Sequence, residues 1–476
     1  MRAEPAPATP GLAGPRSVGP GVGEPGAIDP QPSGPLLPLL ARDPGDIVCR
    51  RGGQPVSCAQ FLGEAAALAA RLPEHRHVVN LCADRTGMLL GFAAALWRGQ
   101  TTLLCADRSP HRLRALADRY PEAYVLADQA IEAPMPVLHI GVLPPAGTTP
   151  AMPLIPAGLV AAIAFTSGST GEPAAHAKPW GALVAGACGA AERFGLQPGG
   201  GPGDAPSATI VATVTPQHMY GFETTIMLPL HAAATAQGGD TFYPSDLFEA
   251  LAAAAPRSIL VTTPLQLRAL LAAGPPPVPP EVVISATAPL AASLAAAVEA
   301  AWGVPVLEIY GATEAGSIAS RRTTADTAWL PYAGVGFHPG GVLMPGLGEV
   351  PLADALDWLP DGRFRLLGRR SDVVKLGGRR ASLAELNRLL AEVAGVEDGV
   401  FVAPEDLEAN PAGRLAAYVV APGRTAEDIL GALRGRIEAI FLPRPVVMLA
   451  ALPRDALGKL SRRALAGLRR AAPDCP

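Results

Sequence analysis

Short apolar stretches alternate with helical patterns along most of this chain. The apolar residues 159–165 precede a helical pattern at 180–193, which is followed by another apolar stretch at 208–214. Short apolar strands that alternate with helices are typical of parallel sheets covered on both faces. We therefore predict an α/β fold with a large N-terminal domain in which parallel-rich sheets are layered with helices.

The composition and the pattern of predicted elements change twice along the 476 residues of the chain. Residues 1–35 are rich in Pro and Gly and carry few large apolar side chains, so we predict a disordered tail. Residues 36–370 are predicted to form the large domain, and residues 371–476 a small α+β C-terminal domain. The joint at 368–372 is short and charged and contains no Pro. It is expected either to let the small domain rotate or to act as a fixed linker.

The composition argues against several classes of protein. Apolar residues make up 49% of the chain and charged residues 17%, which allows a large buried core. A net charge of −4, without a basic stripe of interleaved aromatic residues, argues against a nucleic-acid partner. Six cysteines without a C-x-x-C pair are typical of free thiols in a reducing compartment. The chain shows neither an apolar signal segment nor a run of about 18 apolar residues, so we expect a cytoplasmic protein without a membrane span.

Lysine is rare in this chain, which has three lysines and 35 arginines. Lys178, Lys375 and Lys459 each lie beside glycine-containing segments. Because arginine supplies positive charge elsewhere, we interpret these lysines as candidates for positions that need a compact, flexible ammonium group. The alternative is that the three lysines lie at these positions by chance. Glycine-rich loops with nearby cations are suited to binding phosphate.

A loop of small hydroxyl and glycine residues follows the apolar stretch at 159–165. It consists of Thr166, Ser167, Gly168, Ser169, Thr170 and Gly171. Loops at the carboxyl end of a strand are where α/β folds bind ligands, and glycine lets the backbone approach a ligand closely. The hydroxyl groups can donate to phosphate oxygens, although such loops are often plain linkers. Lys178 lies too far along the chain for the common G-x-x-x-x-G-K-[ST] phosphate loop.

A second polar segment, Tyr310-Gly-Ala-Thr313-Glu314, follows the apolar stretch at 304–309. A glutamate at a strand end beside a phosphate loop is a plausible Mg²⁺ ligand, because Mg²⁺ accepts a single carboxylate together with substrate oxygens. Tyr310 is a candidate to cover an adenine ring. An ordinary helix-capping Thr-Glu pair is the alternative.

Two further candidates lie nearer the C-terminus. Asp354 is a candidate to bind a diol, as acidic residues bind ribose hydroxyls. Asp361-Gly362 predicts a hairpin turn, which leads to Gly368-Arg369. Lys459 follows a glycine near the end of the chain, and in a mobile domain it can reach a developing negative charge.

Taken in order, these segments resemble the adenylate-forming superfamily, which comprises acyl-coenzyme A synthetases, peptide-synthetase adenylation domains and luciferases. The resemblance covers residues 36–470 approximately. It rests on TSGSTGEP, YGATE, WLPDG, VKLGG and LPRDALGKLSRRAL, which appear in the order and with the spacing of that family.

The resemblance implies a nucleoside site. Tyr310 would lie along the adenine of ATP, near the SATAPL segment around Ala288. Asp354 would bind both ribose hydroxyls, and Arg369 would support them.

The resemblance also implies a phosphate and metal site. The loop at 166–171 would cradle the β- and γ-phosphates, Thr313 would contact the α-phosphate, and Glu314 would hold Mg²⁺. This chain departs from the family at Ala174, where a lysine is usual. Lys178 is expected either to supply the missing charge or to be a surface residue.

The acid and thiol steps would use residues from both domains. His218, in the segment TPQHMYG, would lie beside the carboxylate of the acid, and Lys459 would bridge that carboxylate and the α-phosphate. The hinge would lie at Ser371, where the family usually has an acidic residue. Rotation about it would bring Lys375 and Gly378 to the site for thioester formation with the pantetheine thiol of coenzyme A or an acyl carrier protein.

The predicted function is therefore ATP-dependent activation of a small-molecule carboxylic acid, followed by transfer to a thiol. The segments around Lys178 and Glu314 are similar to those of aryl-polyene and xanthomonadin-type ligases, which implies an aromatic or 3-hydroxy acyl acid. One alternative is a kinase or ATPase that transfers the γ-phosphate. Another is a degenerate member of the fold that binds a nucleotide without catalysis, as the loss of lysine at Ala174 allows.

Overall fold

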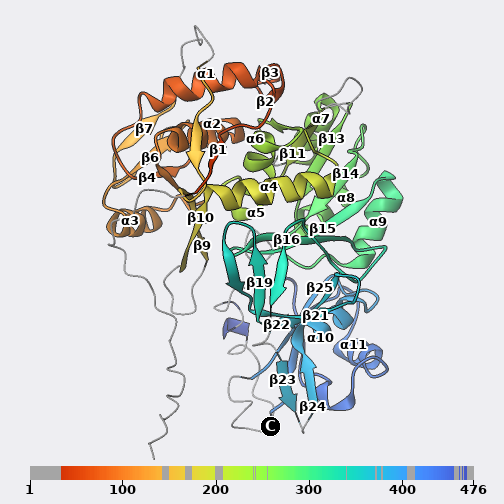
Figure 1. The fold of residues 1–476 in the computed structure, drawn as a ribbon. Coiled ribbons are helices and arrows are strands. Elements are labelled where there is room, and N and C mark those ends of the chain that lie inside the picture. Colours follow the sequence, from red (N-terminus) through yellow and green to blue (C-terminus); the bar gives the residue numbers. More distant parts are fainter. Residues whose placement is uncertain are drawn as a thin grey trace, which may run out of the picture.

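The computed structural model describes most of the chain beyond residue 33 (Figure 1). The described residues are 34–141, 150–166, 174–198, 207–239, 241, 243–254, 256–338, 340–369, 373–376, 379–404, 413–454, 460, 464 and 466–468. The predicted disordered tail at 1–35 lies almost wholly outside them. Among the helices that the structure describes, none has both the length and the apolar character of a transmembrane span. A cytoplasmic location stays a prediction.

The larger sheet has nine strands, and six neighbouring strands in its middle are parallel. In spatial order they are β17 (Leu330–Pro331), β16 (Gly316–Arg322), β15 (Val306–Ala312), β14 (Val282–Ser285), β13 (Ser258–Thr262), β11 (Ala208–Ala212), β12 (Ala234–Gln237), β2 (Ile47–Arg51) and β3 (Gln54–Ser57). The parallel strands run from β15 to β2. The remaining strands, β16, β17 and β3, pair antiparallel at the two edges.

A second sheet of six strands lies beside the first. Its order is β10 (Ala174–Pro179), β9 (Val160–Thr166), β5 (Thr101–Leu104), β4 (His77–Asn80), β6 (Ala123–Ala127) and β7 (Val137–His139). All of its pairs are parallel except β9 with β10. The two sheets confirm the predicted α/β class and its parallel-rich sheets.

Helices cover both sheets. They are α1 (Cys58–Ala69), α2 (Arg85–Trp97), α3 (Pro110–Arg119), α4 (Trp180–Phe194), α5 (Met219–Phe222), α6 (Leu228–His231), α7 (Pro244–Ala253), α8 (Pro264–Ala272) and α9 (Ala292–Trp302). A π-helical turn, η1 (Glu223–Met227), joins α5 to α6. The α2 helix contacts strands of both sheets and packs against η1, so it forms the centre of the core.

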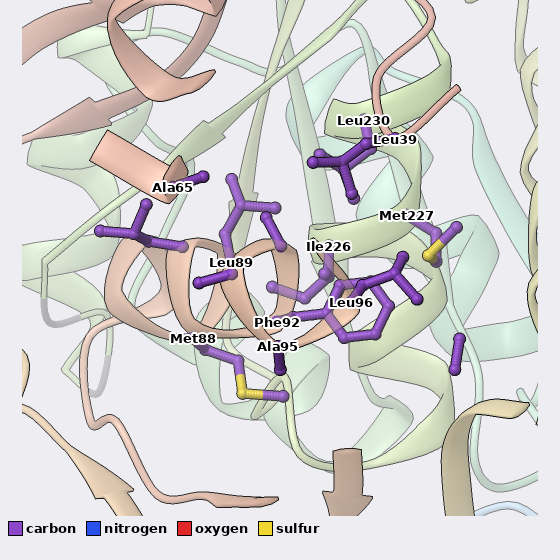
Figure 2. Close-up of a cluster of buried hydrophobic side chains, with 14 of the residues drawn as sticks. Leu39, Ala65, Met88, Leu89, Phe92, Ala95, Leu96, Ile226, Met227 and Leu230 are labelled. Atoms are coloured by element: carbon purple, nitrogen blue, oxygen red, sulfur yellow. The ribbon is translucent and has the colours of Figure 1, made fainter. Parts of the chain in front are cut away.

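Figure 2 shows this core, in which α2 supplies Met88, Leu89, Phe92 and neighbouring residues. Ile226 and Leu230 reach it from η1 and α6. Phe92 and Phe222 meet edge to face with ring centroids 4.9 Å apart, an arrangement that aromatic quadrupoles favour. This packing fixes the α5–η1–α6 segment, which carries several residues of the candidate site.

Short antiparallel sheets follow β17. They are β18 (Gly336–His338) with β19 (Gly341–Met344) and β20 (Gly348–Pro351), the hairpin of β21 (Asp354–Trp358) with β22 (Phe364–Arg369), and β23 (Val373–Leu376) with β24 (Arg379–Ser382). The β21–β22 hairpin turns at Asp361-Gly362, as predicted, and Gly362 has a φ of 82° that suits glycine. A further pair near the N-terminus joins β1 (Leu36–Pro38) to β8 (Leu154–Pro156).

The C-terminal elements, coloured blue in Figure 1, combine one sheet with two helices. The sheet contains β25 (Asp398–Val402), β26 (Ala416–Val420) and β27 (Val446–Met448), and the helices are α10 (Leu383–Ala391) and α11 (Ala426–Leu433). Their apolar core contains buried residues between Val374 and Phe441, contributed by both strands and helices, as in a mixed α+β unit.

The helix α11 ends at Leu433 and is followed by a separate 3₁₀ turn, η3 (Ala439–Phe441). Gly431 and Gly435 lower helix propensity there. The β10 strand had no recognisable strand pattern in the sequence, because AAHAKP lacks β-branched residues; its pairing with β9 determines its conformation.

Candidate active site

The carboxyl ends of the parallel strands bring several of the predicted residues to one edge of the larger sheet. The segment after β11 contains His218, the segment after β14 contains Ala288, and the turn after β15 contains Thr313 and Glu314. Parallel strands end at a common edge, which is where α/β folds bind ligands. This arrangement explains how residues far apart in the sequence form one candidate site.

Tyr310 and Asp354 are joined by a hydrogen bond. The Tyr310 hydroxyl donates to Oδ2 of Asp354 at 2.7 Å. The Tyr310 ring packs against Trp329 and Phe364, with centroid distances of 5.6 and 5.8 Å. Asp354 begins β21 and lies opposite Arg369 of β22. Three of the residues predicted to bind the adenosine, Tyr310, Asp354 and Arg369, are therefore neighbours.

The segment around Ala288 contains an unusual backbone conformation. Thr287 has a φ of 80°, which β-branched residues rarely adopt. Downstream of it, the backbone N–H of Leu290 donates to Oε1 of Glu308 at 2.8 Å. Glu308 is in turn held by Arg321 at 2.9 Å. The segment is thus anchored on one side while Thr287 carries a strained conformation at the sheet edge.

Thr313 and Glu314 lie in the tight turn between β15 and β16, where Ala312 pairs with Gly316. Both side chains are partly exposed. The Glu314 carboxylate makes no hydrogen bond or ion pair with another described residue. Among the described residues, nothing therefore competes with an external ligand for the Glu314 carboxylate.

The β9–β10 pair carries the start of the predicted phosphate loop. Thr166 ends β9 and lies opposite Ala174, which begins β10. The Thr166 Oγ1 atom is 3.0 Å from Nε2 of His176. Burial lowers the pKa of His176, Lys178 lowers it further, and Glu314 opposes the shift. His176 thus lies in a strand and bonds to Thr166, beside the turn that carries Glu314.

Lys178 is a buried lysine that connects this strand to the Glu314 turn. Its side chain is 1% exposed, and Nζ donates to the backbone oxygen of Glu314 at 2.7 Å. Burial lowers the pKa of Lys178 to about 8, although the charges of Glu223 and Glu314 oppose the shift. The expectation that Lys178 is a surface residue is wrong, because β10 directs it inward. A direct contact of Lys178 with phosphate stays a prediction.

The segment that contains His218 is fixed by its neighbours. His218 is the N-cap residue of α5. On one side of it, the Gln217 side chain donates to the Cys82 carbonyl at 2.8 Å. On the other side, the Tyr220 hydroxyl lies 3.0 Å from the carbonyl of Ile284, at the end of β14. These contacts hold His218 at the sheet edge, and its place beside the acid stays a prediction.

Mg²⁺ is suited to this set of donors. Within the described residues, no group of three or more His, Cys, Asp or Glu side chains could hold a metal ion by itself. Glu314 offers a single carboxylate beside the strand that leads to the phosphate loop. Mg²⁺ binds in this way, through one or two carboxylates with substrate phosphates and water.

Several predicted residues lie outside the described part of the chain. They are Ser167, Gly168, Ser169, Thr170, Gly171, Ser371, Gly378 and Lys459. Lys375 lies in β23, where its backbone pairs with Arg380.

Sequence reasoning missed two polar residues near the site, Glu223 and Tyr332. Glu223 accepts hydrogen bonds from the backbone N–H and the hydroxyl of Ser317, the latter at 2.6 Å. The one indication of Glu223 in the sequence is that it is a charged residue within the largely apolar segment GFETTIMLPL. Tyr332 had no signal in the sequence, because it reaches the site from a loop after β17.

The sequence model of the AMP-binding enzyme family matches residues 40–345. The chain belongs to the AMP-binding enzyme family. The matched region contains all of the described site residues except Asp354, Arg369 and Lys375. The predicted adenylate-forming superfamily is therefore confirmed, and the chain is an ATP-using, AMP-forming acid–thiol ligase.

Curated relatives include coenzyme A ligases and peptide synthetases. A 4-coumarate–CoA ligase of Rhodobacter capsulatus is 31% identical over 279 residues, which are 58% of this chain and 68% of that protein. The isonitrile lipopeptide synthase of Mycobacterium tuberculosis is 40% identical over 115 residues, which are 24% of this chain and 4% of that protein.

Solved structures of adenylate-forming enzymes share the fold. The o-succinylbenzoate coenzyme A synthetase of Bacillus subtilis, in complex with ATP and magnesium ion, has a TM-score of 0.74 at 18% identity. The similarity covers 89% of this chain and 97% of that chain. The ATP-bound MatB of Rhodopseudomonas palustris has a TM-score of 0.72 at 20% identity and covers 90% of this chain and 97% of its own.

Proposed function

We propose that this AMP-binding enzyme joins an aryl or 3-hydroxy acyl acid to the thiol of a pantetheine group. A carboxylate oxygen of the acid attacks the α-phosphorus of ATP, and the bond to pyrophosphate breaks. The acyl-AMP then transfers its acyl group to the thiol with release of AMP. The convergence of the Tyr310–Asp354 pair and the Glu314 turn on one sheet edge is the observation that carries this proposal.

The nucleotide would be held through residues of four segments. Tyr310 and Asp354 would bind the adenosine, with Ala288 and Arg369 beside them. The loop at 166–171 would bind the β- and γ-phosphates. Lys178 would add positive charge near the phosphates, because its ammonium group lies at the Glu314 turn. Mg²⁺, when bound at Glu314, supplies charge neutralisation for the triphosphate.

The acid and the triphosphate are both anions, so their approach must be made favourable by positioned donors and cations. Thr313 would donate to the α-phosphate, and His218 would lie beside the acid carboxylate. Lys459 would bridge the two reacting groups from the C-terminal domain, for which we propose the boundaries 371–476. The large domain would then comprise residues 36–370.

The thiol step would follow a rotation about Ser371, which would remove Lys459 and bring Lys375 and Gly378 to the site. We favour coenzyme A as the acceptor, because the curated relatives that match most of their own length are named coenzyme A ligases. An acyl carrier protein is the second candidate, supported by the peptide-synthetase relatives.

The direct test is exchange of labelled pyrophosphate into ATP over aromatic, 3-hydroxy and straight-chain acids. Acid-dependent exchange, with AMP as the product of the complete reaction, supports the proposal. Formation of ADP would instead indicate γ-phosphate transfer. Nucleotide binding without exchange for any acid would indicate a degenerate, non-catalytic member of the fold.

A further inference from the structure

A small cavity lies directly beyond the candidate site. Its volume is about 20 Å³, and a second cavity of about 10 Å³ adjoins it. The two share four lining residues, Gly186, Glu223, Ser317 and Tyr332. A space of this size accepts one group the size of a water molecule or a hydroxyl.

The cavity starts next to the residues assigned to the acid carboxylate. Met219 and Ala315 line it, and they directly follow His218 and Glu314 in the sequence. Lys178 also lines it while donating to the Glu314 carbonyl. An acid whose carboxylate lies between His218 and Glu314 would therefore direct its far end toward this cavity.

The polar lining contains a carboxylate with acceptor sites to spare. Both Glu223 oxygens accept from the Ser317 backbone, at 3.1 and 3.2 Å, and Oε2 also accepts from the Ser317 hydroxyl. A carboxylate can accept about four hydrogen bonds, so acceptor capacity remains toward the cavity. A hydrogen-bond donor that enters the cavity can therefore donate to the Glu223 carboxylate.

The same lining contains an orphaned donor. Tyr332 is 4% exposed, and its hydroxyl has no hydrogen-bond partner in the described part of the chain. Its backbone is held in place by a hydrogen bond from its N–H to the Ile318 carbonyl at 2.9 Å. Buried polar groups in native proteins are nearly always paired, so an unpaired hydroxyl facing a cavity indicates a missing partner.

We propose that this cavity binds a hydroxyl group at the far end of the acid, and that Glu223 and Tyr332 thereby select hydroxylated acids. A hydroxyl donates to Glu223 and accepts from the Tyr332 hydroxyl at the same time. Glu223 and Lys178 both line the cavity and offset each other's charge, so a neutral group that donates and accepts suits it better than a further ion. The inference rests on the proposed acid activation, whose substrate class it narrows.

Tyr332→Phe tests the proposal by removing only the orphaned hydroxyl. The probes are acids that differ by one hydroxyl, benzoate with 3- and 4-hydroxybenzoate, cinnamate with 4-hydroxycinnamate, and octanoate with 8-hydroxyoctanoate. For at least one pair, wild-type kcat/KM in pyrophosphate exchange is expected to favour the hydroxylated acid at least tenfold. Tyr332→Phe is expected to reduce that ratio about tenfold while the acid without the hydroxyl keeps its rate.

A second variant narrows the cavity without removing a polar group. A Cβ at Gly186 of α4 would meet nothing within 4 Å, so Gly186→Ala places one methyl group at the shared lining without a clash. It is expected to reduce the hydroxyl preference. Gly431→Ala in α11, also with no atom within 4 Å, is the matched control, and Tyr243→Phe at a 63% exposed tyrosine is the control for the tyrosine change.

The outcomes separate this inference from the function on which it rests. If no acid supports exchange, the proposed function fails and the inference with it. If acids are activated but every pair reacts equally, or if active Tyr332→Phe keeps the wild-type ratio, the cavity holds only a structural water and this inference alone is overturned.

Discussion

The ammonium group of Lys178 lies 2.7 Å from the backbone oxygen of Glu314, although the two residues are 136 positions apart. This contact ties β10, which leads away from the phosphate loop, to the turn that presents the candidate Mg²⁺ ligand. In this chain the lysine expected at position 174 is absent, and Lys178 brings a positive charge to the same region from inside the protein.

Replacing Lys178 with methionine is expected to weaken the positioning of Glu314. Lys178→Met keeps the length of the side chain but removes the donor to the Glu314 carbonyl. We expect pyrophosphate exchange to fall about 10- to 100-fold and the Mg²⁺ concentration for half-maximal rate to rise. Arg114→Met, at an exposed position on α3, is the control. An unchanged Mg²⁺ requirement in Lys178→Met would contradict the positioning role.

The burial of Lys178 also predicts a pH dependence of stability. Burial lowers the pKa of Lys178 from 10.5 to about 8. Between these values the unfolded chain keeps a proton at this side chain that the folded chain has released, so a rise in pH favours the folded state. Relative to Lys178→Met, the wild-type free energy of unfolding should rise across this window by up to roughly 3 kcal/mol.

Urea denaturation of both proteins at several pH values measures this difference. Below about pH 8 the difference should be constant, since Lys178 is protonated in both states. A difference that falls as the pH increases would show that the ammonium is stabilised, not destabilised, by its surroundings.

Loss of the Asp354 carboxylate is expected to impair ATP binding. Asp354→Ala removes the acceptor for the Tyr310 hydroxyl and the group assigned to the ribose. We expect the KM for ATP to rise about 10- to 100-fold, equivalent to roughly 1.4–2.8 kcal/mol, while the KM for the acid changes little. Asp357→Ala, on the exposed part of the same strand, should keep wild-type values. Equal effects of the two variants would argue against a ribose role.

Thr287 is expected to reduce the stability of the protein through its backbone. A φ of 80° is strained for threonine but ordinary for glycine. Thr287→Gly should therefore raise the free energy of unfolding by about 1 kcal/mol, after the greater flexibility of glycine in the unfolded chain is subtracted. Ala288→Gly, without a positive φ at that position, should lower it. Thermal unfolding of the two variants distinguishes these directions, and destabilisation by Thr287→Gly would contradict the strain.

Local patterns allowed much of this fold to be predicted. The strand β9 and the helix α4 match the predicted patterns at 159–165 and 180–193 to within one residue at each end, because a buried strand and an amphipathic helix are determined by nearby residues. The Asp361-Gly362 turn similarly predicts the hairpin that pairs Asp354 with Arg369. Sequence order and motif spacing were enough to find these parts of the candidate site.

Non-local contacts could not be predicted in the same way. The inward direction of Lys178 depends on the pairing of β10 with β9, and the bond from Ser317 to Glu223 joins residues 94 positions apart. The orphaned Tyr332 hydroxyl depends on several elements packing together around a cavity. Such features follow from tertiary packing and leave little trace in a single sequence.

Acid-dependent pyrophosphate exchange by the wild-type chain and by Lys459→Ala tests the central claim most directly. We predict that the wild-type protein catalyses exchange only when a suitable acid is present, and that Lys459→Ala reduces the rate at least about 10²- to 10³-fold. Exchange at the wild-type rate in Lys459→Ala would contradict the assigned mechanism. The absence of exchange with every acid would contradict the account as a whole.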